Sequence, residues 1–244
     1  MALYAIAFST IGAAATWYTM TRNGLGFYSD EESLKAFATT DEEARRAETI
    51  INTHPLVAQL RKRPDLTESR PHLKMPKEYR QRSLTGGALT GPGYMVVPPY
   101  AWNDSKGAEM VLIGYVGSDL CGHPGIVHGG FLATMLDEAL GRCSFASLPY
   151  KIAVTANLNV NYRKPTPANS FLVLRAETVK AEGRKAWMKG RIESLVEPGQ
   201  TPVVYAEATA LFISPKYAAV RWAPFFPYGV GRLLDGSLRA SDLI

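Results

Sequence analysis

A histidine, two glycines and an acid stand close together near the middle of the 244-residue chain. Residues 125–137 read Gly-Ile-Val-His-Gly-Gly-Phe-Leu-Ala-Thr-Met-Leu-Asp, so that His128, Gly129 and Gly130 are followed by Asp137. Glycine lets another molecule approach the backbone closely, and unpaired N–H groups at the start of a helix attract negative charge. The pattern therefore suits a carbonyl that becomes an oxyanion, with a carboxylate that activates water or attacks directly.

The apolar residues after this turn predict the helix that carries it. They recur at helical spacing on one face, and they are Phe131, Leu132, Met135, Leu136, Ala139, Leu140 and Cys143. We therefore expect a helix over about residues 129–146. Gly130 and Asp137 would lie roughly 10 Å apart along it, at about 1.5 Å per residue. Glu138 points about 100° further around the helix and is the weaker candidate for the acid.

This separation bears on the assembly of the protein. A carbonyl held at Gly129 and Gly130 is out of reach of the Asp137 carboxylate on the same helix, so both can act on one bond only from different subunits. We therefore predict a homodimer, or a dimer of dimers, with composite sites. The plainer alternative is that the glycines form a loop and that Asp137 is a solvated helix residue.

A row of polar residues follows the helix. Residues 152–162 alternate with period two, which is a strong strand signal. The odd-numbered face carries Thr155, Asn157, Asn159 and Asn161. Because asparagine is depleted in strands, we interpret this face as a polar floor that positions water and an amide-rich ligand. The alternative is a solvated outer face.

The two motifs together resemble the hotdog-fold thioesterase superfamily. They are Gly125-x-x-His-Gly-Gly with the later Asp137, and Thr-Ala-Asn-Leu-Asn-Val-Asn-Tyr-Arg-Lys-Pro over residues 155–165. Within that superfamily the chain resembles the mitochondrial acyl-CoA thioesterases of animals and their fungal relatives, over about residues 85–215. The resemblance implies a role in fatty acid metabolism, the hydrolysis of acyl-CoA to free fatty acid and CoA. A longer connection from helix to strand departs from the animal proteins, so acyl-chain length preference does not carry over.

The resemblance also implies roles for individual residues. Asp137 matches the catalytic acid of the family, and Thr155 matches the partner of that acid. Gly130 matches the backbone donor to the thioester carbonyl. His128 matches the histidine of the signature, and we expect it to fix the turn rather than to abstract a proton, because the acid supplies the base.

Further residues are predicted to bind the substrate. Gly129 would add a second N–H to the carbonyl site, and Asn157 would bind the pantetheine amides. The cations expected to meet the phosphates of coenzyme A are Arg163, Lys164, Arg184 and Lys185; a solvated surface is the alternative for each. Coenzyme A enters only as part of the substrate, and no other cofactor is expected. We predict no metal site, because Cys121-x-His123 lacks a second ligand pair.

The remaining patterns predict an α+β fold, in which an antiparallel sheet wraps one long helix as in the hotdog fold. A hairpin of Met95–Pro98 and Glu109–Gly117 should precede the helix. The later strands are expected at 152–162, 171–181, 185–195 and 202–213. Capping-box patterns predict two earlier helices, at about 30–38 and 41–53, with Pro55 ending or kinking the second.

We divide the chain into four parts on these patterns. Residues 1–21 form a hydrophobic anchor or targeting segment, because 2–20 carry no charge and could just span a bilayer; a packed helix is the alternative. A helical and basic extension covers 22–84, the hotdog domain 85–215, and a C-terminal tail 216–244. With the resemblance, this organisation predicts a mitochondrial protein that is membrane-anchored or carries a cleaved targeting segment.

Charge and cysteine content limit the class of partner. The chain is 46% hydrophobic and 20% charged, so it can bury a core, and two cysteines are too few for a disulfide framework. Residues 61–82 hold the whole net charge of +5. This basic segment suits coenzyme A or anionic lipid, or is a solvated connector. Since Tyr79 is its only aromatic residue, we do not expect nucleic acid as a partner.

Other functions remain as alternatives at this stage. A hotdog-fold dehydratase would need a histidine and an acid poised for elimination, and no such pair is seen. A serine hydrolase is disfavoured because Gly-x-Ser-x-Gly does not occur. A non-catalytic acyl-CoA-binding protein, or a membrane-tethered regulator, would bind the thioester without cleaving it.

Overall fold

The computed structural model describes residues 11–13, 15–16, 28–39 and 41–216. Nearly all of the expected anchor or targeting segment, 1–21, and all but the first residue of the C-terminal tail, 216–244, therefore lie outside the described residues. Within the described ranges, no helix combines the length and the apolar character that crossing a bilayer requires.

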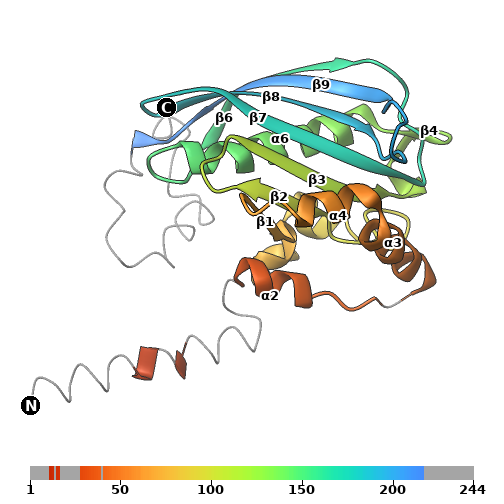
Figure 1. Cartoon of the computed structure of the whole chain (residues 1–244), viewed down its shortest axis with the longest axis horizontal. Helices are drawn as coiled ribbons and strands as arrows, with labels where there is room; N and C mark the ends of the chain where they lie inside the picture. Colours follow the sequence, from red (N-terminus) through yellow and green to blue (C-terminus); the bar gives the residue numbers. More distant parts are fainter. Residues whose placement is uncertain (1–10, 14, 17–27, 40, 217–244) are drawn as a thin grey trace, which may run out of the picture.

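A seven-stranded antiparallel sheet wraps one long helix, α6 (Gly129–Ser147) (Figure 1). The strands are, in order across the sheet, β1 (Leu66–Ser69), β2 (Tyr100–Asp104), β3 (Glu109–Val116), β7 (Ser170–Glu182), β8 (Lys185–Ser194), β9 (Val204–Ile213) and β6 (Val154–Tyr162). A small two-stranded sheet, β4 (Cys121–His123) and β5 (Ile126–Val127), stands just before the helix. The predicted α+β hotdog arrangement and its long helix are confirmed.

The main core lies between α6 and the inner face of this sheet. Leu136 and Leu140 are fully buried there, among alternate residues of β3, β7, β8 and β9. The helix passes so close to β8 that a Cβ on Gly190 would lie 2.9 Å from the Leu140 side chain and 2.6 Å from the Arg175 carbonyl oxygen. Glycine at this position is therefore a packing requirement of the helix–sheet contact.

Helices from the N-terminal extension cover part of the outer face of the sheet. They are α2 (Asp30–Lys35), α3 (Glu42–Thr53) and α4 (Pro55–Arg61). Ile51 and Val57 pack on the outward-facing Trp102 and Val111 in a second core. The expected first two helices are confirmed, and the Ser29 capping box is formed. Pro55 does more than end α3: it occupies the first turn of α4, where its missing N–H has no cost.

The basic segment is built into the fold. It supplies β1, which pairs with β2, and then the short helical turns η1 (Pro71–Lys74), α5 (Lys77–Arg80) and η2 (Leu84–Ala88). Half of its eight cations pair with acids of the same chain: Arg61 with Glu68, Arg63 with Asp65 and Glu109, Arg70 with Glu48, and Lys74 with Asp30. The segment is therefore a folded part of the protein, and the alternative of a solvated connector is wrong.

The first strand of the predicted hairpin was also misplaced. The strand lies at Tyr100–Asp104 instead of Met95–Pro98. Pro98 and Pro99 cannot donate to a strand ladder, so regular pairing begins only after them. Met95 is buried against the main core from a turn-rich approach segment.

Shortening a buried side chain of α6 should lower the stability of the protein more than shortening an exposed one. Leu136→Ala is expected to reduce the free energy of unfolding by about 2–5 kcal/mol, because a fully buried leucine leaves a cavity. Val179→Ala, at a side chain that is 61% exposed on β7, is the control and should change it by less than about 0.5 kcal/mol. Urea unfolding measures both, and equal effects would contradict this account of the core.

Candidate active site

The turn before α6 is held by its own histidine. The Nδ1 atom of His128 accepts a hydrogen bond of 2.9 Å from the Gly130 N–H, and the His128 N–H donates to the Leu120 carbonyl at 2.7 Å. Because Nδ1 is the acceptor, the proton of a neutral His128 ring is on Nε2. The glycines are required here: a Cβ on Gly130 would lie 2.9 Å from Nδ1, and one on Gly122 only 2.8 Å from the ring.

The two glycines at the helix start differ in what they offer a ligand. The Gly130 N–H is occupied by His128, whereas the Gly129 N–H has no hydrogen-bond partner in the part of the chain that the structure describes. The Tyr162 hydroxyl donates to the Gly129 carbonyl at 2.9 Å, and the Tyr162 ring covers this residue. The sequence analysis gave Tyr162 no role and so missed this contact; the position of Tyr162 at the end of the predicted strand was the available signal.

The acid lies further along the helix, beside the start of β6. Asp137 accepts a hydrogen bond of 2.8 Å from the Thr155 hydroxyl. Since Gly129 contacts Tyr162 at the end of β6 and Asp137 contacts Thr155 at its beginning, α6 and β6 run in opposite directions. The structure thus places the predicted carbonyl site and the predicted acid at separate positions of one chain.

A β-bulge separates Thr155 from the three asparagines. The register between β6 and β9 shifts between Thr155 and Asn157, so Thr155 pairs with the buried Phe212 on the helix side. Asn157 and Asn159 follow on the opposite face, where they hydrogen bond to each other at 2.6 Å. The predicted polar floor, which joined Thr155 and the asparagines on one face, is therefore wrong, because the asparagines are exposed on the outer face. The contact of Asn157 with pantetheine stays a prediction.

Comparison with the sequences of known proteins identifies the family of this segment. The family model of the thioesterase superfamily matches residues 124–211, which run from the glycine turn through β6 to β9. The UPF0644 protein PB2B4.06 of Schizosaccharomyces pombe is 36% identical over 180 residues, which are 73% of this chain and 68% of that protein. The chain belongs to the thioesterase superfamily.

Other relatives carry more informative names. An uncharacterized mitochondrial protein of Candida albicans is 31% identical over 65% of this chain and 72% of that protein. Acyl-coenzyme A thioesterase THEM4 of Bos taurus is 40% identical over 144 residues, 59% of this chain, and the match spans 56% of that protein. The family resemblance predicted from the two motifs is thereby confirmed.

In this thioesterase-superfamily chain, the second acid of the helix has a structural partner. Glu138 accepts hydrogen bonds from His72 of η1 at 2.9 Å and from Arg142 at 2.6 Å, with His72 almost wholly buried. Burial alone would raise the pKa of Glu138, but the hydrogen bond from His72 and the neighbouring positive charges hold the pKa well below its ordinary value of 4.5. Glu138 therefore fastens the extension to α6 as an anion.

The four cations predicted to meet coenzyme A phosphates fall into two pairs. The backbone N–H groups of Arg163 and Lys164 donate to the Tyr205 carbonyl at the start of β9. Lys185, by contrast, pairs with Ile213 at the end of that strand. These two positions on β9, Tyr205 and Ile213, are about 26 Å apart at roughly 3.3 Å per residue. Arg184, next to Lys185, also donates to a carbonyl near the end of β9, at 2.6 Å. One chain therefore cannot direct all four cations at one substrate phosphate group.

Neutralising Glu138 should expose its role in stability. Glu138→Gln is expected to lower the free energy of unfolding by about 1.5–3 kcal/mol at pH 7, because charge-assisted hydrogen bonds are lost. The pKa of Glu138 is depressed by folding, so its contribution is complete above about pH 4.5 and is lost as the pH falls below that value. The difference in the free energy of unfolding between wild type and Glu138→Gln should therefore become smaller as the pH falls below about 4.5.

Urea unfolding at pH values between 7 and 3 measures this gap. Glu182→Gln, at an exposed acid of the β7–β8 hairpin, is the matched control and should leave stability unchanged. A gap that stays constant from pH 7 to pH 3 would contradict the assignment.

Proposed function

We propose that the protein hydrolyses acyl-CoA thioesters to free fatty acid and CoA, with each active site shared between two subunits. The observation that carries the proposal is the layout of α6. An exposed helix start with an unpartnered Gly129 N–H stands at one end, and an Asp137 carboxylate oriented by Thr155 stands further along. The match to the thioesterase superfamily and to THEM4 supports the reaction class.

The dimer follows from the edge of the sheet. Among the described residues, strand β6 pairs with β9 alone, so its other edge is available to pair with a second chain. A twofold axis through the middle of β6 would place two β6 strands antiparallel and bring the Tyr162 end of one chain against the Thr155 end of the other. The glycine turn of each subunit would then face the Asp137 of its partner.

The same pairing would regroup the basic side chains. Arg163 and Lys164, beyond the end of β6, would approach the Arg184 and Lys185 end of the partner's sheet. The two pairs of cations that are about 26 Å apart in one chain would then border one composite site, where they can meet the phosphates of coenzyme A.

The reaction uses few groups. The Gly129 N–H, and the Gly130 N–H once it exchanges His128 Nδ1 for the ligand, would polarise the thioester carbonyl; one such donor contributes about 2.7–4 kcal/mol in comparable sites. Asp137 either removes a proton from water, which attacks the carbonyl carbon, or attacks that carbon itself before water releases the acyl group. The C–S bond then breaks, the thiolate leaves and takes up a proton, and Thr155 holds the carboxylate in place.

We further propose a mitochondrial location. The Candida albicans relative is named as a mitochondrial protein, and the uncharged stretch 2–20 is available as a targeting or anchoring segment. Imaging the full-length protein, and a variant without residues 1–21, tests both the location and the function of that segment.

The acid should be indispensable for turnover. Asp137→Asn is expected to lower kcat for palmitoyl-CoA and short acyl-CoAs by at least about 10²-fold, because positioned acid–base groups contribute about 10²–10⁴-fold. Thr155→Val should lower kcat less, since the carboxylate is kept. Thiol release measures both, and Glu182→Gln is the exposed-acid control. Tight acyl-CoA binding by a wild-type protein that releases no thiol would favour the non-catalytic alternative instead.

Mixing two inactive variants tests the shared site. Gly129→Pro removes the free N–H donor at the first position of α6, where proline fits a helix, and Asp137→Asn removes the base. Refolding them together should restore about a quarter of wild-type activity, because half of the dimers are mixed and each mixed dimer has one intact site. Mixed dimers that stay inactive would show that the donor and the acid act within one chain.

A further inference from the structure

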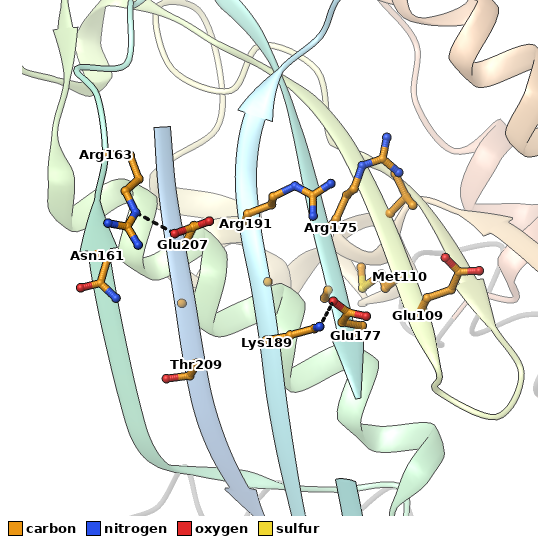
Figure 2. Close-up of a pocket in the computed structure, with 14 residues that line it drawn as sticks. Glu109, Met110, Asn161, Arg163, Arg175, Glu177, Lys189, Arg191, Glu207 and Thr209 are labelled. Atoms are coloured by element: carbon orange, nitrogen blue, oxygen red, sulfur yellow. Dashed lines mark hydrogen bonds and ion pairs between the residues drawn. The ribbon is translucent and has the colours of Figure 1, made fainter. Parts of the chain in front are cut away.

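A charged hollow lies on the outer face of the sheet, on the side away from α6. It has a volume of about 550 Å³ and lies over β3, β7, β8, β9 and β6, beside the area that α3 and α4 cover. Figure 2 shows the arginines, the lysine and the three glutamates that line it from neighbouring strands. None of these side chains takes part in the hydrolysis described above except Arg163.

Two of the arginines are directly opposite each other in the sheet. Arg175 of β7 pairs in register with Arg191 of β8, an arrangement that is destabilising for like charges. A single carboxylate offsets it: Glu193 accepts from the Nε atom of each arginine at 2.6 Å. Because the Glu193 side chain is only 4% exposed, this acid is fixed, and the triad keeps one positive charge in excess.

The attachment leaves the ends of the guanidinium groups free. Both arginines use Nε for Glu193, and their terminal nitrogens make no hydrogen bond to any described residue. Arg163 repeats the arrangement, since its Nε donates to Glu207 at 2.7 Å and its terminal nitrogens are likewise unpaired among the described residues. Lys189, by contrast, is neutralised by Glu177 at 2.9 Å.

We propose that this hollow is a binding site for a ligand with two phosphate groups. The fixed, planar donors of Arg175 and Arg191 match the oxygens of a phosphate, and the excess charge of the triad favours an anion. Arg163 lies two strands from Arg191, about 10 Å at the usual strand spacing, and meets the second phosphate. The backbone of the sheet separates this site from Asp137 of the same chain. A phosphate ester here goes beyond the proposed hydrolysis, whereas coenzyme A as the occupant rests on it.

Two sources carry this chemistry: the 3′,5′-bisphosphorylated nucleotide end of coenzyme A, and a free phosphate ester. Isothermal titration with 3′,5′-ADP, inorganic phosphate and coenzyme A distinguishes them. Arg191→Gln is expected to weaken 3′,5′-ADP binding by about 10- to 100-fold, and Arg191→Lys to weaken it less, because the charge stays and the planar donor pair is lost. In both variants Arg175 still pairs with Glu193, and thermal melting checks the fold.

Lys180→Gln is the matched control, because it removes the same charge from β7 outside the hollow. Parallel losses for coenzyme A and 3′,5′-ADP in Arg191→Gln identify the nucleotide end of the substrate as the occupant. If Arg191→Gln weakens the binding of 3′,5′-ADP and of phosphate but leaves coenzyme A binding unchanged, the occupant is a free phosphate ester. Wild-type protein that binds 3′,5′-ADP no better than Arg191→Gln overturns the site. The readout is equilibrium binding, so it does not depend on hydrolysis.

Discussion

The burial of α6 is the constraint on which the rest of the structure depends. The sheet encloses one side of the helix, and the Glu138 contacts with His72 and Arg142 hold the extension against another. With the helix fixed on both sides, its first turn and Asp137 keep a constant separation and direction. The positions of the predicted reacting groups are therefore set by packing at a distance from them.

Much of this arrangement was readable from local patterns. The 3.6-residue apolar period predicted α6, the two-residue period predicted β6, and the family resemblance joined them into one fold. These signals are strong because each element buries a whole face, so that every turn or alternate residue repeats the same information. The acid, the glycine turn and Thr155 were singled out by the motifs that carry the family resemblance, and the structure brings Asp137 and Thr155 into contact.

Two kinds of feature could not be predicted from the sequence. They are irregularities within a periodic element, and contacts between residues that are far apart in the chain. The bulge after Thr155 adds one residue to a strand and moves every later side chain to the other face, yet the printed alternation looks continuous. The Arg175–Glu193–Arg191 triad depends on strand register, and the pairing of Arg70 with Glu48 on tertiary contact. Such features are decided by which strands become neighbours, and composition carries no record of that choice.

The bulge has a wider meaning for how this fold can change. One strand supplies a hydroxyl to the helix side of the sheet and, two residues later, amides to the opposite face. Substitutions on the two sides of that irregularity are insulated from each other by the backbone. Selection can thus remodel the surface of β6, and whatever docks there, while leaving the carboxylate and its hydroxyl partner untouched.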